Sequence, residues 1–377
     1  MNSELDIKTQ RLAAMLDRES IDAVLINAQH NFTWLTGGRR NGVDGSRENG
    51  VASLVITRHG HRYLLASAIE MERMLTEEVG MTDFQPVDFT WQDEKADTGF
   101  WLEKARFLLG AGATLATDIA FDRGTPSIEG KIAACRYELT PHEIERYRSL
   151  GHDAGAAAEN FIEKIAPGET EQQIAAKFRA ELGSHNIDSV VTLVAADERI
   201  ARFRHPVPTE KRWRHTLLIV TCAKRHGLIA SLSRLICVGK IPDELRSKTE
   251  AAAFVNSSLL AATHVGTAGS ELYSIAARAY AERGFADEIN RHHQGGATGY
   301  KTRDWVAHPK SRESVKTNQA FAWNPSVAGT KIEDTYIAGE NGVEIITCSS
   351  GFPSITIPVN GTDFTSAGIL SLSNRIS

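Results

Sequence analysis

The segment Leu217–Gly239, LLIVTCAKRHGLIASLSRLICVG, carries the clearest structural signal in this chain. Two runs of apolar and β-branched residues flank a polar turn, Lys224-Arg225-His226-Gly227. Runs of this length and composition, separated by a short polar segment that ends in glycine, are typical of a β-hairpin. Few polar side chains interrupt either run, so we expect the hairpin to be buried in its domain.

The composition indicates a globular protein with more than one domain. At 377 residues the chain is too long for one ordinary core, and 42% hydrophobic with 24% charged residues is typical of folded proteins. The net charge of −5 gives no reason to expect nucleic acid as a partner. No apolar run approaches the roughly 20 residues that a membrane span requires, and the charged start lacks the core of a signal peptide. The four cysteines form no C-x-x-C pair, so we expect reduced thiols in a cytoplasmic protein.

The first third of the chain alternates between helical and strand-like patterns. The predicted strands are Ala23–Ile26, Ala52–Thr57, Arg62–Ala66 and Thr114–Thr117, and the predicted helices are Glu4–Glu19 and Ile69–Glu78. Strands that alternate with helices favour a small α/β domain, which we place at residues 1–136.

A second domain, residues 137–377, is expected to begin with two helices. Thr140-Pro141-His142-Glu143 combines a threonine cap, a proline at the first helical position and an acid in the first turn. That helix should end near Ile165, before Pro167-Gly168, and a second helix should follow from Glu169 to Leu182.

Three segments resemble peptidase family M24, the "pita-bread" fold shared by methionine aminopeptidase, prolidase, aminopeptidase P and creatinase. They are the hairpin, the Pro-Gly-x-Thr-Glu turn at Pro167–Glu171, and Asn31-x-x-Trp34-Leu35-Thr36-Gly37, which is similar to a pattern in the prolidase and creatinase N-terminal domain. The resemblance implies an α/β N-terminal domain followed by an α+β pita-bread domain, and a homodimer.

In the peptidases of this family, two Asp, one His and two Glu side chains hold a pair of metal ions. The matching positions here are Val220, Ser231, His293, Asn324 and Glu333. Since closely spaced divalent ions need anionic ligands, one histidine and one carboxylate are too few for two ions. No Asp or Glu lies between Trp213 and Lys240, so no shift of the hairpin register restores a ligand. We therefore expect no dinuclear metal site and no cofactor, with a single weak ion at His293 and Glu333, or a local replacement by Asp334, as the alternative.

Creatinase gives the family a precedent for hydrolysis without metal, and the resemblance places its proton-transfer histidine at His205, in His205-Pro206-Val207-Pro208. Histidine suits this role because its ordinary pKa of about 6.5 lets it accept and return a proton near neutral pH. A loop histidine bonded to backbone is the structural alternative. The resemblance also implies that His293 and Glu333 orient water or substrate.

Neutral side chains are expected to complete the pocket. Asn324 and Ser231 would supply uncharged hydrogen bonds, Ser231 by reaching His293 or by holding water. His292 and His293 precede two glycines, which permit close backbone approach, and a buried pair of neutral imidazoles is the alternative for them.

Basic residues indicate a substrate with a carboxylate. Six arginines and lysines lie within ten residues of His205, and Arg204 or Arg202, if it faces the cleft, would form a bidentate pair with a carboxylate. In creatinase-like dimers an arginine reaches the neighbouring subunit's cleft, and Arg40 matches it, with Arg39 the next choice. Solvated surface arginines are the alternative for all of these.

Three functions remain open from the sequence. The first is a metal-independent hydrolase of a small C–N bonded, carboxylate-bearing substrate, such as an amino-acid or short-peptide derivative. The second is a non-catalytic binding protein with this fold. The third is an Xaa-Pro metallopeptidase with an atypical metal site. No G-x-S-x-G, P-loop or H-E-x-x-H motif offers a competing chemistry.

Overall fold

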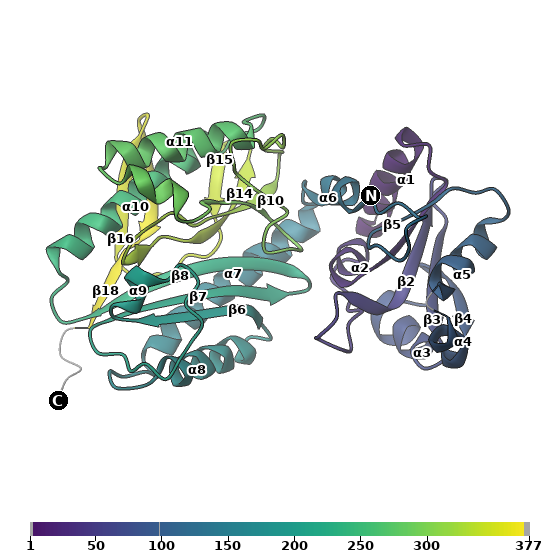
Figure 1. Ribbon diagram of the computed structural model, residues 1–377, viewed down its shortest axis with the longest axis horizontal. Helices are drawn as coiled ribbons and strands as arrows, with labels where there is room; N and C mark the ends of the chain where they lie inside the picture. The colour runs from purple at the N-terminus through teal and green to yellow at the C-terminus, as the bar shows by residue number, and fades with distance from the viewer. Residues whose placement is uncertain (1–2, 98, 373–377) are drawn as a thin grey trace. The chain divides into compact units, whose positions relative to one another are not determined.

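The structure, a computed structural model, describes residues 3–97 and 99–372 (Figure 1). The chain divides after Arg136 into two compact units, Met1–Arg136 and Tyr137–Ser377. None of the helices in the described ranges combines the length and apolar character needed to cross a membrane. The α/β first unit and the α+β second unit confirm the predicted fold class.

The first unit contains a mixed five-stranded sheet in the order β4-β3-β2-β1-β5. Its strands are β1 (Ala23–Ala28), β2 (Asn49–Thr57), β3 (Arg62–Ser67), β4 (Gln85–Phe89) and β5 (Leu115–Thr117). Its helices are α1 (Glu4–Arg18), α2 (Gln29–Leu35), α3 (Met71–Arg73), the π-helix η1 (Met74–Val79), α4 (Trp91–Ala96), α5 (Phe100–Leu109) and α6 (Glu129–Arg136). Leu25, Val55 and Leu65 of the sheet pack against Trp101 and Leu102 of α5 to form one core.

The second unit begins with the two predicted helices, α7 (Pro141–Ile162) and α8 (Glu171–Ser184). Thr140 and Thr170 cap them, and in each case the side chain three residues further on accepts a hydrogen bond from the backbone N–H of the cap residue. The remaining helices are α9 (Arg199–Arg202), α10 (Asp243–Ala262), α11 (Gly269–Glu282) and the 3-10 helix η2 (Ala286–Asn290).

The predicted hairpin forms the centre of a four-stranded sheet in the order β18-β8-β7-β6. Its strands are β6 (Asp188–Ala196), β7 (Thr216–Arg225), β8 (Leu228–Val238) and β18 (Ile369–Leu372). Arg225 pairs with Leu228, so His226 and Gly227 make a two-residue turn, both with positive φ. Figure 1 shows α7 and α8 on one side of this sheet.

A second sheet, in the order β10-β9-β11-β14-β15, completes the unit. Its strands are β9 (Gly295–Thr298), β10 (Trp305–Val306), β11 (Gln319–Trp323), β14 (Asp334–Gly339) and β15 (Gly342–Ile345). Two hairpins stand apart from it, β12 (Ser326–Val327) with β13 (Thr330–Lys331) and β16 (Ser354–Val359) with β17 (Thr362–Ala367). An isolated bridge between Ser233 and Glu333 joins this sheet to the hairpin sheet.

Candidate functional site

The register of the second sheet brings distant parts of the sequence to one edge. Gly295 at the start of β9 pairs with Trp323 at the end of β11, and Trp323 pairs with Asp334 at the start of β14. His293, Asn324 and Glu333 are each within two residues of these positions, so they lie at the same end of the sheet. Strand β8 meets this end through the backbone bond from Ser233 N–H to Glu333 O, 2.9 Å.

Gly295 and Gly296 permit this arrangement because β9 lies between two neighbours at very short range. A Cβ on Gly295, whose φ is 104°, would lie 2.1 Å from the Ala322 carbonyl oxygen. A Cβ on Gly296 would lie 2.1 Å from the Trp305 carbonyl oxygen. The two glycines therefore serve strand packing and set the position of the preceding histidines.

The carboxylate of Glu333 is buried and bound to two cations. Lys331 Nζ lies 2.6 Å from Oε2, and Arg303 Nη2 lies 3.3 Å from Oε1. Ser233 Oγ donates to Oε2 at 2.6 Å. Burial alone would raise the pKa of Glu333, but the charges of Lys331 and Arg303 and the hydrogen bonds from Lys331 and Ser233 outweigh it and lower this pKa to about 2. Glu333 is thus a permanent anion whose charge is already balanced by protein cations.

Three imidazoles gather beside this ion pair. His292 Nε2 lies 3.1 Å from His205 Nε2, and the rings of His292 and His293 stack with centroids 4.4 Å apart. One ring nitrogen from each of the three histidines lies within 4.8 Å of the other two. His292 Nδ1 is buried and has no hydrogen-bond partner among the described residues. His205 and His293 are exposed to solvent, so the cluster is accessible.

All three histidines favour the neutral form. Removal from water lowers the pKa of His292 to about 2 and that of His293 to about 4, and it also lowers the pKa of His205. The positive charge of Lys331 contributes to the lowering at all three, and the negative charge of Glu333 only partly opposes it. Near neutral pH the cluster therefore offers uncharged ring nitrogens that can accept hydrogen bonds or bind a ligand.

The hairpin contributes no carboxylate to this edge. Val220 pairs with Ser233 and Cys222 pairs with Ser231, so these four side chains share one face of the sheet, which Glu333 covers. The Ser231 hydroxyl, however, donates to Cys222 Sγ at 3.4 Å and does not reach His293, which corrects the expected partner. Ser231 is fully buried, and its contact with substrate stays a prediction.

Two other predicted positions have different outcomes. Asn324 is buried, and its Oδ1 has no partner among the described residues. This end of the second sheet therefore holds one hydrogen-bond acceptor without a donor. Asp334, considered as a replacement ligand, accepts from Arg234 Nη2 at 2.9 Å and Thr347 Oγ1 at 2.8 Å. Asp334 Oδ2 has no partner among the described residues, and the local replacement of a ligand by Asp334 stays a prediction.

These residues do not fit a pair of divalent ions. Among the described residues, the cluster of possible ligand atoms contains three histidines and no carboxylate, and both carboxylate oxygens of Glu333 are held by Lys331 and Arg303. A pair of dications would meet two fixed positive charges with one negative charge to offset them. We therefore derive no step through a dinuclear centre.

The predicted arginines lie in different surroundings. Arg204 forms an ion pair with buried Glu288, and its Nη1 donates to Ser326 Oγ at 3.2 Å. Glu288 also accepts a hydrogen bond from Ala328 N–H, so its ion pair with Arg204 anchors the loop that carries His205. This structural role accounts for the position of Arg204 better than a contact with substrate does. Arg40 lies in the first unit, where its side chain is exposed and its backbone N–H donates to Glu78. Its contact with substrate stays a prediction.

Sequence reasoning missed Lys331 and Arg303. Lys331 had a local signal, since it stands two residues before Glu333 and residues at this spacing in extended chain share a face. Arg303 had none, because it reaches Glu333 only through the pairing of β9 with β10 and β11.

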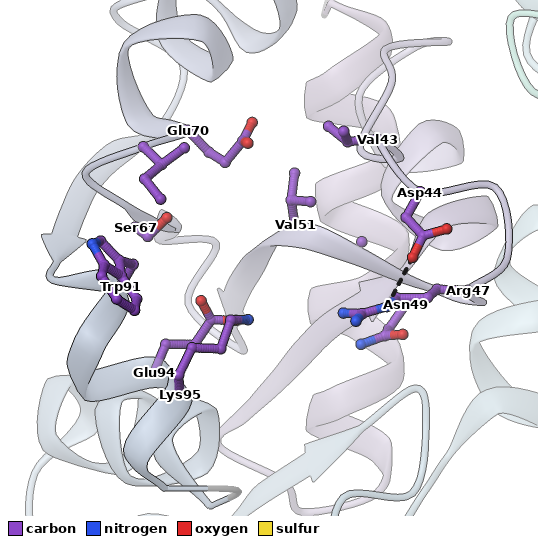
Figure 2. Close-up of a pocket in the computed structure, with 12 residues that line it drawn as sticks. Val43, Asp44, Arg47, Asn49, Val51, Ser67, Glu70, Trp91, Glu94 and Lys95 are labelled. Atoms are coloured by element: carbon purple, nitrogen blue, oxygen red, sulfur yellow. Dashed lines mark hydrogen bonds and ion pairs between the residues drawn. The ribbon is translucent and has the colours of Figure 1, made fainter.

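The first unit has a separate hollow of about 190 Å³. Figure 2 shows Val43 and Asp44 on one side of it and Trp91, Glu94 and Lys95 on the other. Asp44 is paired with Arg47 at 3.1 Å, so its charge is balanced within the rim. None of the predicted site residues lines this hollow.

Known proteins match both units. Residues 145–346 match metallopeptidase family M24, and residues 8–153 match the creatinase/prolidase N-terminal domain. The chain is 23% identical to the Xaa-Pro dipeptidase of Pyrococcus horikoshii over 350 residues, which are 90% of this chain and 96% of that protein. It is 26% identical to the Pyrococcus furiosus Xaa-Pro dipeptidase over 230 residues, 58% of this chain and 66% of that one.

Solved structures show the same fold. The prolidase of Pyrococcus horikoshii superposes with a TM-score of 0.75 at 20% identity, over 91% of this chain and 98% of that one. Dipeptidase PepE of Mycobacterium ulcerans gives 0.78 at 15% identity, over 98% of each chain. The N-terminal domain of the FACT complex subunit SPT16 from chickpea gives 0.70 at 12% identity, over 92% of this chain and 97% of that domain.

Proposed function

Because this chain belongs to metallopeptidase family M24, we propose that it hydrolyses a carbon–nitrogen bond, and that it does so without the family's pair of metal ions. The supporting observation is the bonding of Glu333 to Lys331 and Arg303 within electrostatic range of three neutral histidines. The substrate class is a small amino-acid or peptide derivative with a free carboxylate. The names of the relatives, Xaa-Pro dipeptidases, agree with a C–N bond in such a molecule.

In this proposal His205 is the proton-transfer residue. A water molecule attacks the carbon of the C–N bond and gives one proton to a ring nitrogen of His205. The same proton then passes to the leaving nitrogen as the C–N bond breaks, so atoms and charge balance. His292, at 3.1 Å from His205, requires that one of the two Nε2 atoms donates and the other accepts, and this fixes the orientation of the His205 ring.

The other residues orient the reactants. His293 holds water or substrate, and Asn324 offers its unpartnered Oδ1 to a substrate N–H. Glu333 keeps Lys331 and Arg303 at the edge of the cluster, where their excess positive charge favours a substrate carboxylate and the anion that forms during attack.

A comparison of variants with and without chelator tests this proposal. The full chain is assayed against dipeptides, N-acyl amino acids and amidino amino acids, each with and without EDTA. We expect turnover that EDTA does not change and a loss of about 100-fold or more in His205→Gln, since general acid–base catalysis contributes at least that much. His152→Gln, on the exposed face of α7, is the matched control and should retain the parent activity. Activity that EDTA abolishes and Mn²⁺ or Zn²⁺ restores would instead identify a metallopeptidase with an atypical site.

A binding protein is the second candidate function. The same fold occurs in the N-terminal domain of SPT16, a subunit of the FACT complex. Ligand binding to the parent and to His205→Gln with equal affinity, without turnover of any substrate by either, would favour this candidate.

We further propose a homodimer in which Arg40 of one copy meets the substrate carboxylate in the cleft of the other. Light scattering of the purified chain tests the dimer. Arg40→Ala should raise KM at least about tenfold with kcat little changed if it contributes uniform binding of the carboxylate.

A further inference from the structure

We propose that His205, His292 and His293 bind one borderline transition metal ion reversibly, and that this ion inhibits the protein. The binding site stands on the geometry of the cluster alone. Its inhibitory effect rests on the proposed role of His205 in proton transfer.

The three imidazoles are close to the geometry of a metal site. Imidazole nitrogens lie about 2.0–2.1 Å from Zn²⁺, so neighbouring ligands of a tetrahedral ion are roughly 3.3–3.4 Å apart. The Nε2 atoms of His205 and His292 are already 3.1 Å apart, and the third nitrogen lies within 4.8 Å of both. Rotation of exposed side chains closes this difference, because His205 and His293 are not packed on all sides.

His292 supplies a second, independent indication of a ligand. Its Nδ1 is buried and meets no hydrogen-bond partner among the described residues. A buried polar atom without a partner costs free energy, and a bound group on the cluster would remove that cost either directly or by letting the ring turn.

The ligand set selects the kind of ion. An all-imidazole site suits Zn²⁺, Co²⁺, Ni²⁺ and Cu²⁺, whereas Mg²⁺ and Ca²⁺ require oxygen ligands. Lys331 and Arg303 leave one uncompensated positive charge after Glu333 is counted. Because this positive charge repels a dication, it lowers the affinity of the site for the metal ion. The bound ion therefore exchanges with solution and differs from a permanently bound cofactor.

The ion is expected to inhibit because it would bind the nitrogen lone pairs that the proposed hydrolysis uses. A metal ion on His205 occupies the ring nitrogen that would otherwise accept the proton from water, and His293 loses its freedom to orient that water. The effect of zinc is therefore opposite in sign to that expected for a metal-activated member of the family.

Metal binding is measured first, without any substrate. The full chain is treated with chelator, dialysed, and titrated with Zn²⁺ by calorimetry and with Co²⁺ by visible absorption. We expect one ion per chain, with no heat from Mg²⁺. Removal of a residue that only supports a ligand weakens metal binding about 10–100-fold, so His292→Gln and His293→Gln should each lose at least tenfold, while the control His152→Gln binds like the parent.

The outcomes separate the site from the proposed function. A parent that binds neither Zn²⁺ nor Co²⁺, or glutamine variants that are folded by circular dichroism and bind like the parent, would overturn the site. Zinc that binds at the cluster and lowers turnover in the same concentration range supports both claims. Zinc that binds there and raises turnover leaves the site in place and overturns metal-independent hydrolysis, and zinc that binds without any effect on turnover overturns the inhibition.

Discussion

Lys331 Nζ lies 2.6 Å from Glu333 Oε2, and both side chains are almost completely buried. With Arg303 on the other oxygen, this carboxylate is bonded to two cations from its own chain. These two cations explain how a carboxylate that is almost completely removed from water stays ionised, because their charges outweigh the effect of burial on the pKa of Glu333.

Replacement of Glu333, the acidic partner of this ion pair, should lower the stability of the protein. Glu333→Gln leaves Lys331 and Arg303 buried without a counter-charge, and removal of one partner of a buried pair typically costs roughly 3–5 kcal/mol. We expect a loss of this size in urea unfolding. The double variant Lys331→Met with Glu333→Gln should recover part of it, and a Glu333→Gln variant as stable as the parent would show that the pair contributes little.

Glu288 should act as a positioning residue for His205. Glu288→Gln removes the charge that holds Arg204, so the loop that carries His205 is no longer fixed against η2 and Ala328. Misplacement of a reacting group by about 1 Å costs up to 100-fold in rate, and we expect a loss in kcat larger than the change in KM. Zinc affinity should fall in parallel because His205 is displaced. A variant that alters thermal stability alone would assign Glu288 to packing.

Gly295 should tolerate no side chain. In Gly295→Ala the new Cβ would meet the Ala322 carbonyl oxygen at 2.1 Å, which forces β9 away from β11. Overpacking of this kind costs about 1–3 kcal/mol beyond the strain of a positive φ. Gly284→Ala is the matched control, since Gly284 also has a positive φ but nothing within 4 Å. Equal losses in the two variants, measured by thermal unfolding, would argue against the close approach of these strands.

Glu129 links stability of the first unit to pH. Burial would raise its pKa, but hydrogen bonds from His30 and Asn31 and the charge of Arg136 lower it to about 2. A depressed folded pKa means that the contribution of Glu129 is present above about pH 4.5 and is lost as pH falls toward 2. The stability difference between the parent and Glu129→Gln should therefore be largest near neutral pH and shrink in acid. A difference that is constant over this range would contradict the assignment.

Local sequence features account for most of the fold. The Lys224–Gly227 turn, the threonine caps at Thr140 and Thr170, and the strand pattern of the first unit each predicted an element that the structure contains. Each of these features is set by residues that are close together in the sequence, so the sequence alone is sufficient to predict it. The π-helical end of the Ile69–Glu78 segment was not anticipated, because helical periodicity does not distinguish the two hydrogen-bond patterns.

The site was only partly predictable for the same reason. The sequence indicated His205, His293 and Glu333 one by one, and their proximity depends on the pairing of β9, β11 and β14. The cations on Glu333 come from residues 2 and 30 positions away in sequence, and only the nearer one has a local signal. The partner of Ser231 was not anticipated, because Cys222 lies opposite it only in the observed hairpin register.

Metal analysis of the native protein tests the central claim most directly. The full chain is purified without added metal or chelator, its zinc, manganese, cobalt and iron are measured by mass spectrometry, and turnover is followed during dialysis against EDTA. We expect no stoichiometric pair of ions and turnover that survives dialysis. Two ions per chain that are lost together with activity, and that restore activity when returned, would rule out metal-independent hydrolysis.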